Sequence, residues 1–139
     1  MSIIRAVIDT NVLHAGLYSA TGASFRLLRF VEAGGLIPVL STTLLFEYED
    51  VLKRNRELLG LSVKAIEDVL DGLCSRGEAR KIYFLWRPQL PDPKDDHVLE
   101  LAVAAGSVPI VTHNARDFHI ARTFGVRVIK PAEMLKELL

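Results

Sequence analysis

Features that mark secreted, membrane-spanning or disulfide-bonded proteins are scarce in this sequence. Its 139 residues include one cysteine, Cys74, so no internal disulfide can form and a reducing compartment is expected. No apolar run approaches the roughly 18 residues that a membrane span needs. The N-terminus has no charged stretch followed by a long apolar run, so we expect no signal peptide and a cytoplasmic protein. Because Cys74 lies among Val69, Leu70 and Leu73, we expect it to be buried.

The sequence also carries no net charge. The 17 basic residues balance the 17 acidic ones, and a neutral chain does not coat nucleic acid through bulk electrostatic attraction. A local site remains open, since a bound metal ion can supply positive charge there. Zinc is not expected, because His97 and His113 have neither a cysteine partner nor an HExxH-type spacing.

What the sequence does contain is a pattern of short apolar strands alternating with helical segments. Half of the residues are hydrophobic, enough for one domain, residues 1–139, with one core. The alternation predicts a three-layer α/β/α fold with a central parallel sheet of four or five strands. Expected strands span 5–8, 36–40, 108–111 and 126–129, with a strand or extended segment at 81–86 that includes Trp86. Expected helices span 25–33, 42–52, 61–73, 93–106, 117–124 and 131–139, with a loop over 14–24 and a helical excursion over about 60–80.

The first strand ends abruptly at small polar residues, Asp9, Thr10 and Asn11. In an open α/β sheet, ligands bind in the crevice beyond the carboxyl ends of the strands. Asp9 is therefore a candidate functional carboxylate held by rigid backbone. The alternative is an ordinary turn residue that accepts hydrogen bonds from the next amides.

Other acids fall near the same edge of the predicted sheet. Glu47 lies in the helix after the second strand, and Asp95 and Asp96 lie in the first turn of the helix that begins at Asp92-Pro93. Asn114 and Asp117 follow the strand over 108–111. Because the carboxyl ends of parallel strands share one edge, these side chains are expected to converge although they are far apart in the sequence.

Converging carboxylates repel one another, and a divalent cation removes that cost. Ligands that are all oxygen suit Mg²⁺ or Mn²⁺, which keep several waters and accept substrate phosphates. Such a site can lower the pKa of a bound water and hold the oxygens of a phosphoryl displacement, with no Ser, Cys or His nucleophile. The pattern thus favours metal-dependent phosphoryl displacement.

Each acid also has a structural explanation. Asp92 and Asp117 fit helix caps, and Asp95 and Asp96 complement a helix dipole. Periodicity does not choose Glu47 over Glu49, since both flank the buried stripe of the helix.

Several short motifs in the sequence resemble those of a known protein family. Val7-Ile8-Asp9-Thr10-Asn11-Val12, Ser41 with Glu47 six residues later, and Asp96 followed by an apolar helix and Ile110-Val111-Thr112 are similar to successive motifs of PIN domains. PIN domains are the ribonuclease fold used by the toxins of many toxin–antitoxin pairs. Residues 112–118, Thr-His-Asn-Ala-Arg-Asp-Phe, resemble the last motif, with Asn114 standing where many relatives have an acid.

The resemblance implies a Mg²⁺- or Mn²⁺-dependent endoribonuclease that cleaves single-stranded RNA. It selects Glu47 over Glu49 and assigns the metal to Asp9, Glu47 and Asp96, with Asp95 as a rival of Asp96 and Asp117 as a fourth catalytic carboxylate. Supporting roles fall to Asn11, Ser41, Thr112 and Asn114. It further implies a homodimer, an antitoxin protein as partner and no membrane. The alternative is a catalytically weak PIN-fold module that binds RNA or protein.

Overall fold

The computed structural model of the protein describes residues 3–82 and 90–139. Its strands form one parallel sheet in the order β3-β2-β1-β4-β5. The strands are β1 (Ile4–Ile8), β2 (Leu36–Leu40), β3 (Glu78–Ala79), β4 (Ile110–Val111) and β5 (Val128–Ile129). The helices are α1 (Thr10–Tyr18), α2 (Ala23–Ala33), α3 (Thr42–Arg54), α4 (Arg56–Leu59), α5 (Val63–Arg76), α6 (Asp96–Ala104) and α7 (Pro131–Leu138), with 3₁₀ segments η1 (Pro93–Asp95) and η2 (Ala115–Phe124).

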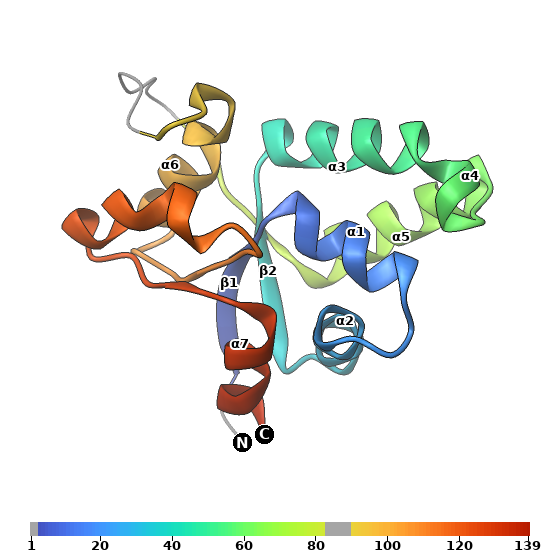
Figure 1. Ribbon diagram of the computed structural model, residues 1–139, viewed down its shortest axis with the longest axis horizontal. Coiled ribbons are helices and arrows are strands. Elements are labelled where there is room, and N and C mark those ends of the chain that lie inside the picture. Colours follow the sequence, from blue (N-terminus) through green and yellow to red (C-terminus); the bar gives the residue numbers. More distant parts are fainter. Residues whose placement is uncertain (1–2, 83–89) are drawn as a thin grey trace.

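Helices flank the sheet, as the alternation of strands and helices predicts. In Figure 1, α1, α3 and α5 lie to one side of β1 and β2, and α6 and η2 lie to the other. Helix α6 packs on β1, β2 and β4, and α2 and α5 both contact β2. The α/β/α prediction with a parallel sheet is confirmed.

Strand β1 is the centre of the sheet. Its first half pairs with β2, with Ile4 opposite Leu36, and its second half pairs with β4, with Val7 opposite Ile110. Its last three residues are buried on both faces, which is why the strand reads as a continuous apolar run. The residue that follows, Asp9, is therefore held from both sides, and its amide donates to the Val111 carbonyl at 2.9 Å.

The segment after β1 differs from the prediction of a loop over 14–24. Helix α1 continues to Tyr18, so residues 14–18 are helical. Gly16 favoured the prediction of a loop, but in the structure this glycine lies against α2. A Cβ added at Gly16 would lie only 2.6 Å from Leu28 Cδ1. The glycine allows α1 and α2 to pack closely, a use of glycine that sequence alone does not distinguish from a turn.

Helix α3 begins where the sequence predicts. Ser41 is its N-cap, and the Ser41 hydroxyl accepts a hydrogen bond from the Leu44 amide at 3.1 Å. The stripe that faces the core includes Leu44, Tyr48 and Leu52. Ser62 caps α5 in the same way, through the Ala65 amide.

Two further expectations need comment. Cys74 is exposed rather than buried, because α5 presents that position outward while Leu73 packs inward. The extended segment expected at 81–86, with Trp86, lies largely outside the described residues.

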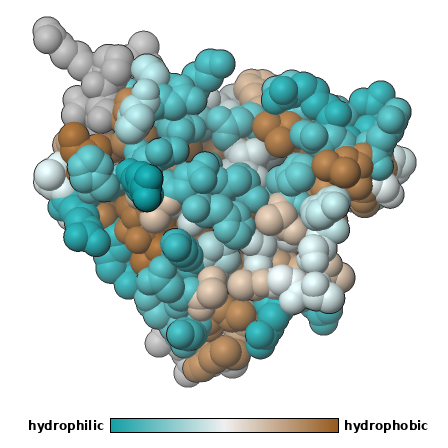
Figure 2. Space-filling view, in the orientation of Figure 1, coloured by the Kyte–Doolittle hydropathy of each residue, from teal (hydrophilic) through white to brown (hydrophobic). Residues whose placement is uncertain are grey.

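Figure 2 shows a mostly hydrophilic face with smaller hydrophobic patches. Within residues 3–82 and 90–139, none of the helices combines the length and the apolar character required to cross a bilayer.

Candidate active site

Asp9 occupies the position that the first strand predicts for it. It is 7% exposed and is the N-cap of α1. Its Oδ1 accepts the Thr10 amide at 2.9 Å, and its Oδ2 accepts the Thr112 hydroxyl at 2.7 Å. The carboxylate is thus both a helix cap and the junction between the ends of β1 and β4, so the two readings of Asp9 are compatible.

Glu47 reaches the same edge from the second turn of α3. Its Oε2 accepts a hydrogen bond from the Thr10 hydroxyl, and its Oε1 lies 3.1 Å from His97 Nε2. Tyr48, the next residue, is fully buried and donates its hydroxyl to the Ile8 carbonyl. That bond fixes α3 against the end of β1, which holds Glu47 beside Thr10.

Glu49 does not share this environment. Its carboxylate pairs with Lys53 one turn along α3, with Lys53 Nζ 3.0 Å from Oε2. The two glutamates that the periodicity left open are therefore distinguished by their partners. Glu47 contacts the strand edge, and Glu49 belongs to a surface ion pair.

The adjacent aspartates at the start of α6 have different surroundings. Asp96 is buried, and its Oδ1 accepts the Leu90 amide at 3.0 Å, which anchors the chain entering the helix. Asp95 is half-buried in the last position of η1. Burial raises the pKa of Asp95 to about 6, and the negative charges of Asp9, Asp92 and Glu47 add to that rise.

The same electrostatic coupling appears at the other acids. Burial raises the pKa of Asp9 against the hydrogen bonds from Thr112 and Thr10, and the charge of Glu47 adds to the increase. Burial also acts to raise the pKa of Glu47, but hydrogen bonds from His97 and Thr10 outweigh it and lower that pKa. Asp9, Glu47 and Asp95 therefore lie close enough to feel one another's charge.

At the end of β4, the other predicted residues make a polar network. Thr112 is fully buried, and its Oγ1 accepts the Asn114 amide at 3.0 Å while donating to Asp9. Asn11 bridges the two strand ends, because Nδ2 lies 3.4 Å from Thr112 Oγ1 and Oδ1 accepts the His113 amide at 3.2 Å. Asn11 and Thr112 thus hold Asp9 in place.

Asp117 lies apart from these contacts. It is half-buried in the first turn of η2, and its amide bonds to the Asn114 carbonyl. In the described part of the chain, its carboxylate forms no ion pair or hydrogen bond with Asp9, Glu47 or Asp95. Ser41 likewise acts as the cap of α3.

A preformed metal cage is absent from the residues that the structure describes: no group of three His, Cys, Asp or Glu side chains is arranged to hold an ion. The donor chemistry nevertheless fits a hard divalent cation, because Asp9, Glu47 and Asp95 supply oxygen ligands. Across residues 3–82 and 90–139, none of the three pairs with a Lys or Arg.

Sequence reasoning missed two contributors, Thr10 and His97. Thr10 links Glu47 to β1, and His97 donates to Glu47 from the first turn of α6. Nδ1 of His97 is buried without a hydrogen-bond partner among the described residues. A helix beginning at Thr10 would have placed its hydroxyl beside Asp9, whereas the contact of His97 depends on tertiary packing.

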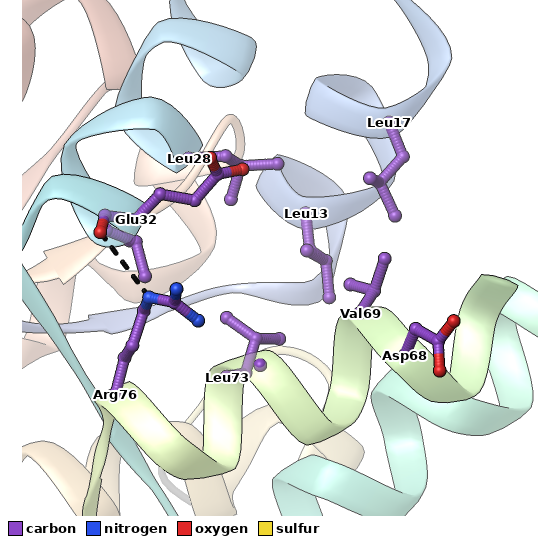
Figure 3. Close-up of a pocket in the computed structure, with 10 residues that line it drawn as sticks. Leu13, Leu17, Leu28, Glu32, Asp68, Val69, Leu73 and Arg76 are labelled. Atoms are coloured by element: carbon purple, nitrogen blue, oxygen red, sulfur yellow. Dashed lines mark hydrogen bonds between the residues drawn. The ribbon is translucent and has the colours of Figure 1, made fainter.

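An apolar opening lies elsewhere. Figure 3 shows Leu13, Leu17 and Leu28 from α1 and α2 facing Val69 and Leu73 from α5, around a cavity of about 300 Å³. Arg76 Nε donates to the Glu32 carbonyl at its rim, at 3.4 Å. None of the proposed carboxylate ligands lines this cavity, so it is separate from the candidate site.

The structure thus combines a parallel sheet with helices on both sides and coupled acids beyond the carboxyl edge of that sheet. A family model of the PIN domain matches residues 5–116, and the chain belongs to the PIN-domain family. PIN domains are generally nucleases that act on nucleic acids and typically bind divalent metals. A search of curated proteins finds no match.

Proposed function

We propose that the protein is a Mg²⁺- or Mn²⁺-dependent endoribonuclease that cleaves single-stranded RNA, as a hydrolase of phosphodiester bonds. The observation that carries the proposal is the electrostatic coupling of Asp9, Glu47 and Asp95, which have no Lys or Arg partner within the described residues. Like charges held by rigid elements favour an external cation, since the alternative is to take up protons. A bound ion would activate water and stabilise charge on the transferred phosphate.

Asp9, Glu47 and Asp95 are the ligands in this proposal, and Asp96 takes a positioning role. Asp96 holds the Leu90 amide, whereas the charges of Asp9 and Glu47 act on Asp95. Thr112 and Asn11 orient Asp9, and His97 and Thr10 orient Glu47. Asp117 and Asn114 remain candidates for contacts to a second ion or to substrate.

The biological setting is part of the same proposal. The protein acts as the toxin of a toxin–antitoxin pair, forms a homodimer and is blocked by an antitoxin protein. We place it in the cytoplasm, since a reducing compartment suits a chain with a single cysteine.

Cleavage of a single-stranded RNA in Mn²⁺ or Mg²⁺ tests the activity. Asp9→Asn is expected to lower the rate at least about 100-fold, because it removes a charge needed for the ion without removing the helix cap. Glu49→Gln, in the same helix as Glu47 but paired with Lys53, is the matched control and is expected to cleave normally. Equal cleavage by Asp9→Asn and wild type would refute the assignment and favour the alternative of a binding module without turnover.

A further inference from the structure

A second cavity lies on the side of α1 that faces α2 and α7. Its volume is about 340 Å³. Small apolar residues from the three helices form much of its wall, including Ala15, Ala23 and Ala132, and Tyr18 contributes an aromatic ring. Figure 2 shows white and beige residues, of intermediate hydropathy, where these helices meet in Figure 1.

Polar groups line the same cavity. His113 and Lys130 both contribute to its wall, and Ser24 lies beside them. The Ser24 hydroxyl is 3.0 Å from His113 Nε2, which fixes the imidazole ring. Lys130 forms no ion pair with any acid in the described chain, and its side chain is exposed. The cavity therefore combines apolar walls with hydrogen-bonding groups and one available positive charge.

Tyr18 is a suitable stacking surface. Its side chain is 59% exposed, and its ring stacks on His14 with centroids 6.3 Å apart and an angle of 15°. An exposed aromatic ring supported on one face by a neighbour can offer its other face to a planar group. Nucleobases stack on such rings regardless of their identity.

The cavity is tied to the candidate active site by short covalent and hydrogen-bonded links. His113 directly follows Thr112, which donates to Asp9, and the His113 amide donates to Asn11. Along α1, Tyr18 lies nine residues after Asp9, or about 13 Å at 1.5 Å per residue. A single strand covers that distance in a few nucleotides.

We propose that this cavity holds one unstacked nucleobase of the RNA substrate, with the base against Tyr18 and the adjoining phosphate near Lys130. The assignment rests on the proposed ribonuclease function, since it is the strand bound at Asp9 that would reach the cavity. Recognition by stacking and one phosphate contact discriminates weakly among bases, so the subsite fixes the position of the strand rather than its sequence.

Binding is measured without catalysis by titrating ¹⁵N-labelled full-length protein, in EDTA, with each ribonucleoside 5′-monophosphate and with ribose 5-phosphate. The nucleotides are expected to shift the amide signals of Ala15, Gly22, Ala23 and His113, and ribose 5-phosphate is not. Tyr18→Ala is expected to weaken binding about fivefold or more, because stacking contributes at least that factor per base. Phe46→Ala, which removes a similarly exposed aromatic from α3, is the control and should bind as wild type.

Equal shifts with ribose 5-phosphate, or equal affinity in Tyr18→Ala and wild type, would overturn the subsite.

A second variant, Ala132→Trp, fills the cavity from an exposed position and is expected to raise the KM for RNA while leaving kcat nearly unchanged. If wild type cleaves RNA and both variants match its KM, the subsite alone fails. If nucleotides bind there and wild type does not cleave, the ribonuclease proposal alone fails. Protection of the cavity by a co-purified protein, with no nucleotide shifts, would assign the surface to a protein partner instead.

Discussion

The two ends of β1 carry charged residues in opposite arrangements. Near its start, Arg5 forms two hydrogen bonds to Glu78, at 2.9 and 2.5 Å, and a third to the Ala105 carbonyl. Just past its end, Asp9 lies among carboxylates that have no Lys or Arg partner within the described residues. Hydrogen bonds from Arg5 and Arg80 lower the pKa of Glu78 to about 2, whereas burial and like charges raise the pKa of Asp95 to about 6.

The difference separates a structural cluster from the proposed metal-binding cluster. At the first cluster, the protein supplies both signs of charge, so ionisation stabilises the fold. At the second, no Lys or Arg of the described residues pairs with the acids, and burial makes ionisation of Asp9 and Asp95 unfavourable until a cation arrives from outside. The raised pKa values of Asp9 and Asp95 therefore mark the second cluster as the candidate functional site.

The largest expected effect is the response of the two clusters to metal. Mn²⁺ at about 100 times its Kd is expected to stabilise the wild type by about 2.7 kcal/mol, which corresponds to a rise of about 5–10 °C in the melting midpoint for a chain of this size. Asp9→Asn is expected to lose this rise. In EDTA its midpoint should equal or exceed that of wild type, because the charge removed is one that burial disfavours.

Differential scanning fluorimetry in EDTA and in Mn²⁺ measures both quantities. Asp68→Asn removes an exposed acid that pairs with Lys64 on α5, and it should keep the full metal response. A metal-induced rise in Asp9→Asn as large as in wild type would show that the ion binds elsewhere.

The next effect is a pH dependence of metal binding. A metal ligand must be deprotonated, so the affinity for Mn²⁺ is expected to rise about tenfold between pH 5 and pH 7 as Asp95, with its pKa of about 6, loses its proton. In the metal-free protein, the effect of rising pH on the stability of the fold is opposite, because Asp95 then destabilises it. The folded-state pKa lies above the ordinary value of 3.8, so Asp95 stabilises the fold at acid pH and loses that contribution as the pH rises through 6.

Calorimetric titrations of Mn²⁺ at pH 5, 6 and 7 separate the two aspartates. Asp95→Asn is expected to bind more weakly and to lose this pH dependence, while Asp96→Asn retains it, because an asparagine Oδ1 can still accept the Leu90 amide. The reverse result would assign the ligand to Asp96.

The sequence predicted the parts of this comparison that depend on strand order. The apolar run before Asp9 placed that carboxylate beyond a strand of a parallel sheet, and the helix signal at Asp92-Pro93 placed Asp95 and Asp96 near the same edge. The resemblance assigned the ligand to Asp96, with Asp95 as a rival, and the sequence did not show that the first turn here is 3₁₀. The structure distinguishes the two aspartates by their surroundings, because Asp96 accepts the Leu90 amide whereas the charge of Asp9 acts on Asp95.

Contacts between distant segments were also beyond the sequence. Thr10 and His97 reach Glu47 across 37 and 50 residues. Helix α1 was missed because Gly16 fits both a loop and a close helix contact. The Arg5–Glu78 cluster joins residues 73 positions apart, and no local pattern signals it.

The smallest expected effect comes from breaking the structural cluster. Glu78→Gln is expected to lower the free energy of unfolding at pH 7 by about 1 kcal/mol, because a part-buried bidentate pair exceeds an exposed one but is still screened by solvent. Since the pKa of Glu78 is lowered, its contribution is present above about pH 4.5 and is lost as the pH falls toward 2. Urea denaturation should therefore show a difference in the free energy of unfolding between variant and wild type at pH 7 that narrows toward pH 3.

Glu137→Gln, the control, breaks a more exposed bidentate pair with Arg127 and should lower the free energy of unfolding by less. RNA cleavage at 25 °C should be unaffected in both variants. A loss of cleavage in Glu78→Gln without a loss of stability would mean that the two ends of β1 are functionally coupled, and the separation of structural from functional charge would not hold.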